Sequence, residues 1–345
     1  MKFSVTLPVF AEPGGRDPYR PTFELAQVAE ESGYDTVTIG HHHFMAGNLS
    51  DPLTFMAAVA VRTNTLRVGT GIFLLAMHHP LRVAEQVALI DQLSNGRISL
   101  GVGTGWWDLE YTALGSDIRQ RGARIEEALQ VLHRVWTEES VSSDGRFYPF
   151  PTLTVHPRPV QHPHPPLWVA GVADAAIDRA ARLGDAWLCG PVQSFNKAQA
   201  CLATYRDACA RLGRSPDWIL RRYAWIGTSR RTVEEEKLPP MVDSQLAHWR
   251  ESAEDEEERR LFARIDAGEH VPASEIARDR FLWGAPEDVI EQITRYRAAT
   301  GCEHLHVAFG GGLPARTMDT DARGLYEELR EMFVLFGREV IPAFS

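Results

Sequence analysis

The chain has 345 residues, of which 44% are hydrophobic and 24% are charged, an ordinary composition for a globular α/β protein. Its net charge of −10 at pH 7 argues against a nucleic acid or an anionic membrane surface as a partner, because both require a basic patch. The four cysteines form no C-x-x-C pair, and the sequence has neither a signal-peptide layout nor an apolar run of membrane-spanning length. We therefore expect a cytoplasmic protein with reduced thiols.

Eight apolar, β-branched runs alternate with helical segments along the chain. The runs cover residues 3–10, 35–44, 66–75, 97–107, 167–171, 185–189, 219–227 and 304–309. Such alternation predicts parallel strands joined by right-handed helical crossovers. Eight strands favour an α/β fold of the closed (β/α)8 TIM-barrel type, with an open doubly wound sheet as the alternative. The open sheet is disfavoured because no G-x-G-x-x-G sequence follows the first strand.

We expect one domain, residues 1–345, in which insertions follow the fourth and seventh strands. The first insertion, 141–166, is rich in proline and is expected to be an extended surface excursion or a small hairpin. The second insertion, 232–280, is polar. It is expected to be a solvated helical insertion, and a mobile lid is the alternative.

Unusual residues stand where the second, third and fourth strands end. Three histidines occupy 41–43, glycines interrupt 69–71, and alternating glycines at 101–105 precede Trp106 and Trp107. The carboxyl ends of parallel strands are where active sites of such folds lie. Glycine weakens a strand unless a ligand or another backbone comes close, so a packing bulge is one interpretation. Two glycine-marked strand ends beside aromatic rings favour the other, a planar cofactor.

Histidines at this rim are suited to proton transfer, because the ordinary pKa of histidine is near neutrality. Strand alternation sends His42 to one side and its two neighbours to the other. A metal site that adds His78 and His79 is an alternative, but no H-E-x-x-H motif occurs and we expect no metal. Loop histidines without a function are the remaining alternative. Farther along, Gly171 precedes a helix that begins near Ala173, and the free N–H groups of a helix N-terminus can bind phosphate.

The order and spacing of several short motifs resemble the bacterial-luciferase-like flavin monooxygenase family, which also includes enzymes that use the deazaflavin F420. The motifs extend over nearly the whole chain and comprise the His-His-Phe end of the second strand, residues 67–71, 79–86, 93–97, 101–106, Glu110, 114–115, 121–124, 157–161, 163–166, 180–185 and 284–289. Each motif is weak alone, and together they are specific for the family.

The resemblance implies a TIM barrel that binds reduced flavin at its C-terminal rim. By position, His42 matches the catalytic histidine near the flavin ring and His43 matches its neighbour. Gly71 and Ile72 match a non-prolyl cis peptide under the isoalloxazine ring. The other implied residues are Thr104, Gly105, Trp106 and Trp107 along the ribityl chain and phosphate, Ala170, Gly171, Val172 and Ala173 at the phosphate loop, and His41, His79 and Glu110 near the substrate or behind the catalytic histidines.

Three positions depart from the family pattern. His41 stands where many members have glutamate, and Thr104 stands where luciferase has an arginine for the phosphate. Val172 and Ala173 stand where a polar residue is common. The resemblance then implies that backbone N–H groups and the helix dipole bind the phosphate, which leaves room for F420 as well as FMN.

The resemblance implies a two-component monooxygenase. Reduced FMN (FMNH2) would arrive from a separate flavin reductase and react with O2 to a C4a-peroxyflavin that oxygenates a small organic substrate. An F420-dependent hydride-transfer oxidoreductase and a non-catalytic flavin-binding protein are the alternatives. We also expect a homodimer, both from the family and because the helix at 52–61 is apolar on nearly every side. No motif identifies the substrate.

Overall fold

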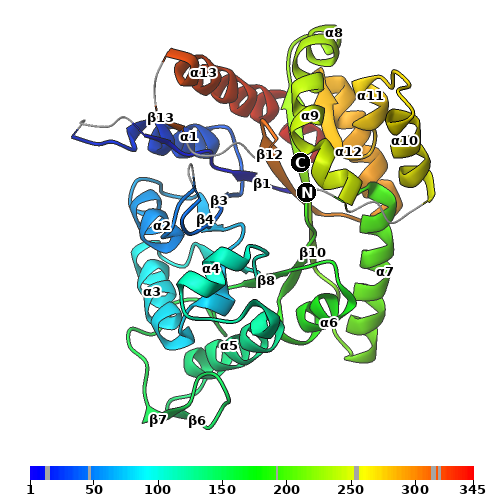
Figure 1. Ribbon diagram of the computed structural model, residues 1–345. Helices are drawn as coiled ribbons and strands as arrows, with labels where there is room; N and C mark the ends of the chain where they lie inside the picture. The colour runs from blue at the N-terminus through cyan, green and yellow to red at the C-terminus, as the bar shows by residue number, and fades with distance from the viewer. Residues whose placement is uncertain (12–15, 46–47, 192, 252–255, 312–315, 318–319) are drawn as a thin grey trace.

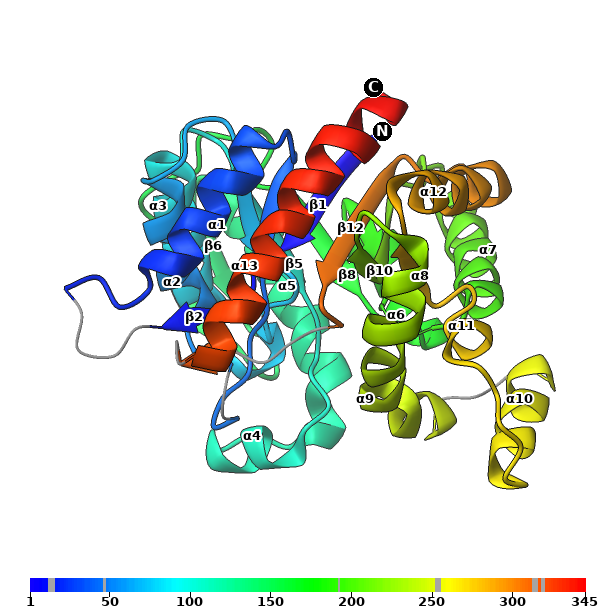
Figure 2. The same cartoon turned by 90° about the horizontal axis from the view of Figure 1, so that it is seen from above.

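The computed structural model describes every residue except 12–15, 46–47, 192, 252–255, 312–315 and 318–319. In this described part of the chain, eight parallel strands form a closed barrel with helices around it (Figures 1 and 2). In chain order the barrel strands are β1 (Lys2–Thr6), β3 (Thr36–Ile39), β4 (Arg67–Thr70), β5 (Ile98–Val102), β8 (Leu167–Ala170), β9 (Ala186–Leu188), β10 (Trp218–Ile226) and β12 (His304–Phe309). Each strand pairs in parallel with the next, and β12 pairs with β1. The predicted (β/α)8 barrel is confirmed.

The strands form because their residues can be buried on both faces. Every residue of β3, β5 and β12 is buried, including the polar threonine and serine side chains among them. Parallel sheets covered by helices require such runs, in which apolar residues do not alternate with exposed polar ones. The strand interiors therefore read as continuous β-branched segments in the sequence.

One helix or group of helices follows each barrel strand and packs outside it (Figure 1). The outer helices are α1 (Arg20–Glu31), α2 (Pro52–Ala60), α3 (Pro80–Leu93), α5 (Arg121–Thr137), α6 (Asp174–Leu183), α7 (Phe195–Arg211), α12 (Pro286–Thr300) and α13 (Thr320–Leu335), with the short α4 (Asp108–Ala113) before α5. The start of α2 shows how local sequence fixes a boundary. Asp51 accepts the N–H of Thr54 at 3.1 Å, and Pro52 occupies the first turn, where its missing N–H costs nothing.

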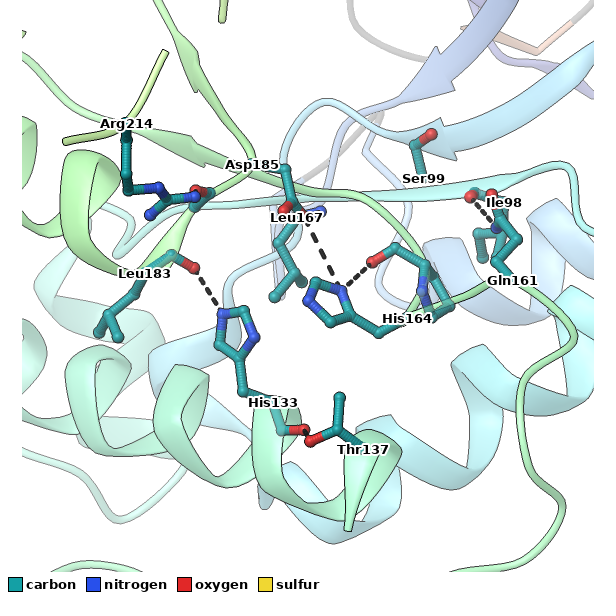
Figure 3. A network of polar contacts seen from close by, with 12 residues as sticks. Ile98, Ser99, His133, Thr137, Gln161, His164, Leu167, Leu183, Asp185 and Arg214 are labelled. Carbon is teal, nitrogen blue, oxygen red and sulfur yellow. Dashed lines mark hydrogen bonds and ion pairs between the residues drawn. The ribbon is translucent and has the colours of Figure 1, made fainter. Parts of the chain in front are cut away.

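The proline-rich insertion forms a small antiparallel hairpin of β6 (Val141–Ser143) and β7 (Phe150–Leu153), and residues 154–166 then lead into β8. Polar contacts anchor that segment at the N-terminal ends of the strands (Figure 3). Gln161 Nε2 donates to the carbonyl of Ile98 at 2.8 Å, and His164 Nδ1 lies 3.8 Å from Asp185 Oδ2. Asp185 also accepts the N–H of Leu167 at 2.7 Å. These contacts join the segment to the barrel at the end remote from the predicted site.

The second insertion has an apolar core of its own. It contains α8 (Arg230–Thr232), a π-helical turn (Val233–Lys237), α9 (Leu238–Glu251), α10 (Glu256–Asp266) and α11 (Ala273–Ile276). Trp249 of α9 is fully buried, and its ring centroid lies 5.1 Å from that of Phe281. The prediction of solvated helices is therefore incomplete, and residues 252–255 within it lie outside the described residues.

The sequence did not predict β11 (Phe281–Gly284), which follows these helices and pairs in parallel with the upper half of β10. Strand β9 pairs with β10 only at Trp218 and Ile219. Farther along β10, β11 takes the place of β9 as the neighbouring strand. The insertion helices gather on this side of the barrel, beside α12 (Figures 1 and 2). None of the described helices is long and apolar enough to cross a membrane.

Candidate active site

His42 and Glu110 meet at the C-terminal rim of the barrel. The chain leaves β3 at Ile39, and His42 follows three residues later, with its side chain 22% exposed. Its Nδ1 lies 3.2 Å from Oε1 of Glu110, a residue of α4 whose side chain is fully buried. The same carboxylate oxygen accepts the backbone N–H of His43 at 2.6 Å. Glu110 thus fixes both the imidazole and the backbone that carries it.

The neighbouring histidines point away from His42 and form a cluster with His78. His41 Nε2 lies 3.0 Å from His43 Nε2, and the His41 and His78 ring centroids are 5.3 Å apart. The backbone N–H of Leu74 donates to His41 Nδ1 at 3.2 Å. Neutral His41 therefore carries its proton on Nε2, directed toward His43. The expected split of the three histidines between two sides is confirmed by these contacts.

Burial keeps the clustered histidines neutral. Loss of solvent, reinforced by the neighbouring imidazoles, lowers the pKa of His41 to about 2. Burial lowers the pKa of His78 to about 4, and it also lowers the pKa of His43. These rings are therefore uncharged at neutral pH.

The cluster also has the geometry that a metal would need, since ligand nitrogens of His41, His43 and His78 all lie within 4.8 Å of one another. The tautomer argues against such a site, because Leu74 occupies the Nδ1 lone pair of His41 and leaves a proton on Nε2. A protonated ring nitrogen cannot bind a metal ion. The absence of a metal stays a prediction. His79 lies outside the cluster and caps α3, with Nδ1 accepting the N–H of Leu81 at 3.3 Å.

Residues 71–73 follow β4 at the C-terminal end of the barrel. The peptide bond between Gly71 and Ile72 is cis, as the resemblance implies. Ile72 is partly exposed and lies across Gly103, where an added Cβ would be 2.1 Å from Ile72 Cδ1. Behind it Phe73 is buried, with its ring centroid 4.9 Å from that of His41. Ile72 thus presents an apolar surface, and the adjacent Phe73 packs against the histidine cluster.

Two of the strand glycines have a structural cause. A Cβ at Gly69 would lie 2.6 Å from the carbonyl oxygen of Ser99, and a Cβ at Gly101 would lie 2.1 Å from that of Thr70. Both clashes are with the backbone of the neighbouring strand, which cannot move away without opening the sheet. For these two positions the interpretation as bare backbone for a planar ligand is wrong, and strand packing explains them.

The fourth strand leads into the tryptophan segment. Trp106 is 67% exposed, and its ring centroid is 6.1 Å from that of His42. Trp107 is half-buried and immediately precedes α4, so it turns the chain toward Glu110. The carbonyl of Thr104 accepts the hydroxyl of Tyr111, and Gly105 takes a φ of +76°, a conformation that favours glycine. A large apolar ring therefore stands in solvent beside the candidate catalytic histidine.

The end of β8, the strand paired with β5, offers a second binding element. Ala170 ends the strand, and Gly171 takes a φ of +148°. Half-buried Val172 follows, and exposed Ala173 is the N-cap of α6, to which it contributes no side-chain hydrogen bond. The first N–H groups of α6 are thus available to an anion, as the sequence predicts. The exposed Asp174 in the first turn works against a phosphate.

The comparison with known proteins agrees with this arrangement. A model of the luciferase-like monooxygenase family matches residues 1–303. The chain belongs to this family. The oxygenase component of a flavin-dependent trigonelline monooxygenase from Acinetobacter baylyi is 28% identical over 61% of this chain and 60% of its own. An F420-dependent glucose-6-phosphate dehydrogenase from Nocardia farcinica is 26% identical over 91% of this chain and 95% of its own.

Among solved structures, the monooxygenase RslO1 from Streptomyces bottropensis superposes with a TM-score of 0.79 and 26% identity over all of both chains. The luciferase-like chain spans 60%, 47% and 46% of the lengths of the first curated relatives that it matches, or about half. The names of the relatives include both flavin-dependent and F420-dependent enzymes.

The residues of this luciferase-like protein fit a flavin-type cofactor that carries a phosphate, on two observations. The partly exposed Ile72 and the exposed Trp106 present apolar surface beside His42, which suits a tricyclic ring. The uncapped N-terminus of α6 suits its phosphate, and a Cβ at Gly171 would lie 2.4 Å from the Cβ of Ala176, so only glycine lets the chain turn there.

Sequence reasoning missed one charged residue inside the barrel, Arg221 on β10. Its Nη1 donates to the carbonyl of Gly71 at 2.9 Å, at the cis peptide. The signal in the sequence was the pair Arg221-Arg222 within an otherwise apolar strand. Alternation along that strand turns Arg222 outward, where it is fully buried with its guanidinium 5.6 Å from the ring of Tyr296.

Proposed function

We propose that this protein is a monooxygenase that uses reduced FMN and O2 to oxygenate a small organic substrate. The observation that carries the proposal is the buried Glu110 on Nδ1 of His42, beside the apolar surfaces of Ile72 and Trp106. A separate flavin reductase that supplies FMNH2 and a homodimeric assembly are parts of the same proposal. Relatives named as flavin-dependent monooxygenases support it.

Bound reduced FMN would supply the electrons that activate O2, and the residues of the chain would control protons and water. Glu110 accepts the Nδ1 proton of His42, which leaves Nε2 as the nitrogen that exchanges a proton with the reacting atoms. His43 is tied to the same carboxylate through its backbone N–H. Ile72 and Trp106 would cover the ring and exclude water, which strengthens the polar contacts in the site.

The test combines binding with oxygen reactivity. The purified protein is mixed anaerobically with FMNH2 and then with O2, and flavin reoxidation is followed by absorbance together with peroxide release. We expect saturable FMNH2 binding and reoxidation that is slower than for free flavin. Reoxidation at the rate of free FMNH2, with no measurable FMNH2 affinity, would refute the proposal.

An F420-dependent hydride transfer is the second candidate. It is favoured by relatives with that activity in their names that align over 91% of this chain and 95% of their own length. The polar cluster around His42 and Glu110 would serve either cofactor. Tight binding of reduced F420 without oxygen uptake would select this candidate. Binding of oxidised FMN without turnover would instead select a non-catalytic flavin-binding protein.

A further inference from the structure

Arg221 lies inside the barrel and contacts two neighbouring segments. Its Nη1 donates to the Gly71 carbonyl at 2.9 Å, and its Nη2 donates to Thr6 Oγ1 at 3.3 Å. Its buried Nε has no hydrogen-bond partner within the described part of the chain. No carboxylate pairs with Arg221 among the residues that the structure describes, although the arginine lies between three barrel strands.

The groups around Arg221 are neutral. His306 is fully buried, and its Nε2 lies 2.9 Å from Thr6 Oγ1 and 3.2 Å from Thr38 Oγ1. Burial and the adjacent Arg221 hold the pKa of His306 well below its ordinary value, so this ring is uncharged. Tyr223 stands on the same side of β10, and burial raises the pKa of its hydroxyl, with Arg221 opposing the shift. One positive charge is therefore left uncompensated.

An uncompensated charge at this depth is costly unless something pairs with it. Arginine has five N–H donors in a planar fork that matches carboxylate and other oxoanion groups. Two of these donors are engaged by Gly71 and Thr6, so the side chain retains donors for a ligand. Arg221 as a whole residue is half-buried and not fully enclosed.

We propose that Arg221 binds an anionic group, a carboxylate or a sulfonate, of the substrate. Calling the anion a substrate rests on the proposed monooxygenase function, but its binding does not. The anion would lie beside the Gly71 carbonyl, within reach of the Arg221 guanidinium, and the rest of the substrate would extend toward His42. The reduced flavin ring is a second source of negative charge. The ring is expected over the Gly71–Ile72 peptide, whose carbonyl Arg221 contacts, so the experiment must separate the flavin from the substrate as the source of the charge.

The experiment measures binding of matched acids and amides by calorimetry, in the absence of oxygen. The probes are benzoate with benzamide, butyrate with butyramide, and methanesulfonate with dimethylsulfone. The proteins are wild type, Arg221→Gln, Arg221→Lys and the control Arg119→Gln, whose arginine side chain is 87% exposed. Circular dichroism and thermal melting establish that each variant is folded.

We expect at least one anion to bind wild type about tenfold or more tightly than its neutral partner, equivalent to about 1.4 kcal/mol. The preference should vanish in Arg221→Gln, recover in part in Arg221→Lys, and persist in Arg119→Gln. Equal binding of every acid and amide to wild type would overturn the proposal. So would an acid preference that survives in Arg221→Gln.

Two further arms separate the sources and the hypotheses. If Arg221→Gln weakens FMNH2 about tenfold, leaves oxidised FMN unchanged and keeps the acid preference, the arginine serves the flavin and the proposal is wrong. Should Arg221→Gln fail to fold, the Arg221→Lys variant decides, since its compact ammonium loses the bidentate contact and should reduce the preference. Anion binding without oxygen reactivity would refute the monooxygenase function and leave the anion site standing.

Discussion

Glu110 Oε1 lies 3.2 Å from His42 Nδ1, and the carboxylate has no exposed surface. Because Glu110 accepts the Nδ1 proton of His42, Nε2 of His42 can exchange protons with bound molecules. We expect His42→Ala to lower kcat by about two to four orders of magnitude, the usual contribution of a general acid or base. FMNH2 affinity should change much less. Unchanged turnover with reduced flavin and O2 would remove His42 from the mechanism.

Glu110→Gln tests whether the carboxylate positions the histidine. An amide oxygen can still accept from Nδ1 of His42 or the N–H of His43, but its NH2 group must occupy the position of Oε2, which is buried without a partner. We expect a loss of about tenfold to a hundredfold in kcat, with an altered pH profile of kcat. A merely structural role would lower the melting temperature and leave the pH profile of the folded enzyme unchanged.

Gly101 and Gly103 are expected to respond differently to alanine. A Cβ at Gly101 would lie 2.1 Å from the backbone oxygen of Thr70, so strands β4 and β5 must separate. We expect Gly101→Ala to lower the free energy of unfolding by about 1–3 kcal/mol or more, measured in urea. The close contact of a Cβ at Gly103 would be with the flexible end of Ile72, and Ala170 Cβ lies at an ordinary 3.8 Å, so Gly103→Ala should keep stability and weaken FMN binding. The opposite ranking in stability would contradict this account.

The sequence predicted the barrel because its signals are local and repeated. Strand burial on both faces gives continuous apolar runs, and Asp51-Pro52 marks a helix start without any tertiary information. It could not predict contacts between distant segments. His78 packs against His41 and Phe73, whereas the adjacent His79 caps α3, and the turn after Phe73 decides which of the two faces the cluster.

The role of the strand glycines and of the second insertion also depended on tertiary contacts. Gly101 looks the same in sequence whether a ligand or the Thr70 carbonyl excludes its side chain. The insertion reads as polar because its core is small and is completed by Phe281, a residue of the barrel edge. Arg221 could have been noticed as a charge within an apolar strand, but only the barrel places it beside Gly71.

The insertion should depend on the buried ion pair between Arg280 and Glu258. Their side chains are 3% and 8% exposed, and the Arg280 guanidinium lies 5.0 Å from the ring of Trp249. Removing one partner of a buried pair costs about 3–5 kcal/mol. We expect Arg280→Met to open the insertion locally, seen as faster limited proteolysis within 232–280 and a red-shifted tryptophan emission.

The matched control for that variant lies on α10, the helix that carries Glu258. Arg260 pairs with Glu256, and their side chains are 76% and 77% exposed. Because exposed ion pairs contribute under about 1 kcal/mol, Arg260→Met should leave the proteolysis rate unchanged. Equal rates for Arg280→Met and Arg260→Met would show that the buried pair does not hold the insertion closed.

The histidine cluster should make the protein sensitive to acid. In the folded chain the pKa of His78 is about 4, whereas a histidine in the unfolded chain titrates near 6.5. Between these pH values the unfolded chain takes up a proton that the folded chain does not, so stability falls as the pH falls. Above pH 6.5 both states are neutral and this contribution is absent. Acidification therefore lowers the stability of the protein, and this loss is complete once the pH falls below the pKa of His78 in the folded chain.

The His78→Gln variant removes the proton uptake of this one histidine. His78 Nε2 is buried without a hydrogen-bond partner, so glutamine can replace the ring without breaking a bond at that atom. We expect the dependence of the unfolding free energy on pH, measured in urea between pH 6.5 and 4, to become shallower by up to about 1.4 kcal/mol per pH unit. The exposed His270 provides the control, and His270→Gln should keep the wild-type slope. A slope that is the same in both variants would mean that His78 takes up its proton in the folded protein.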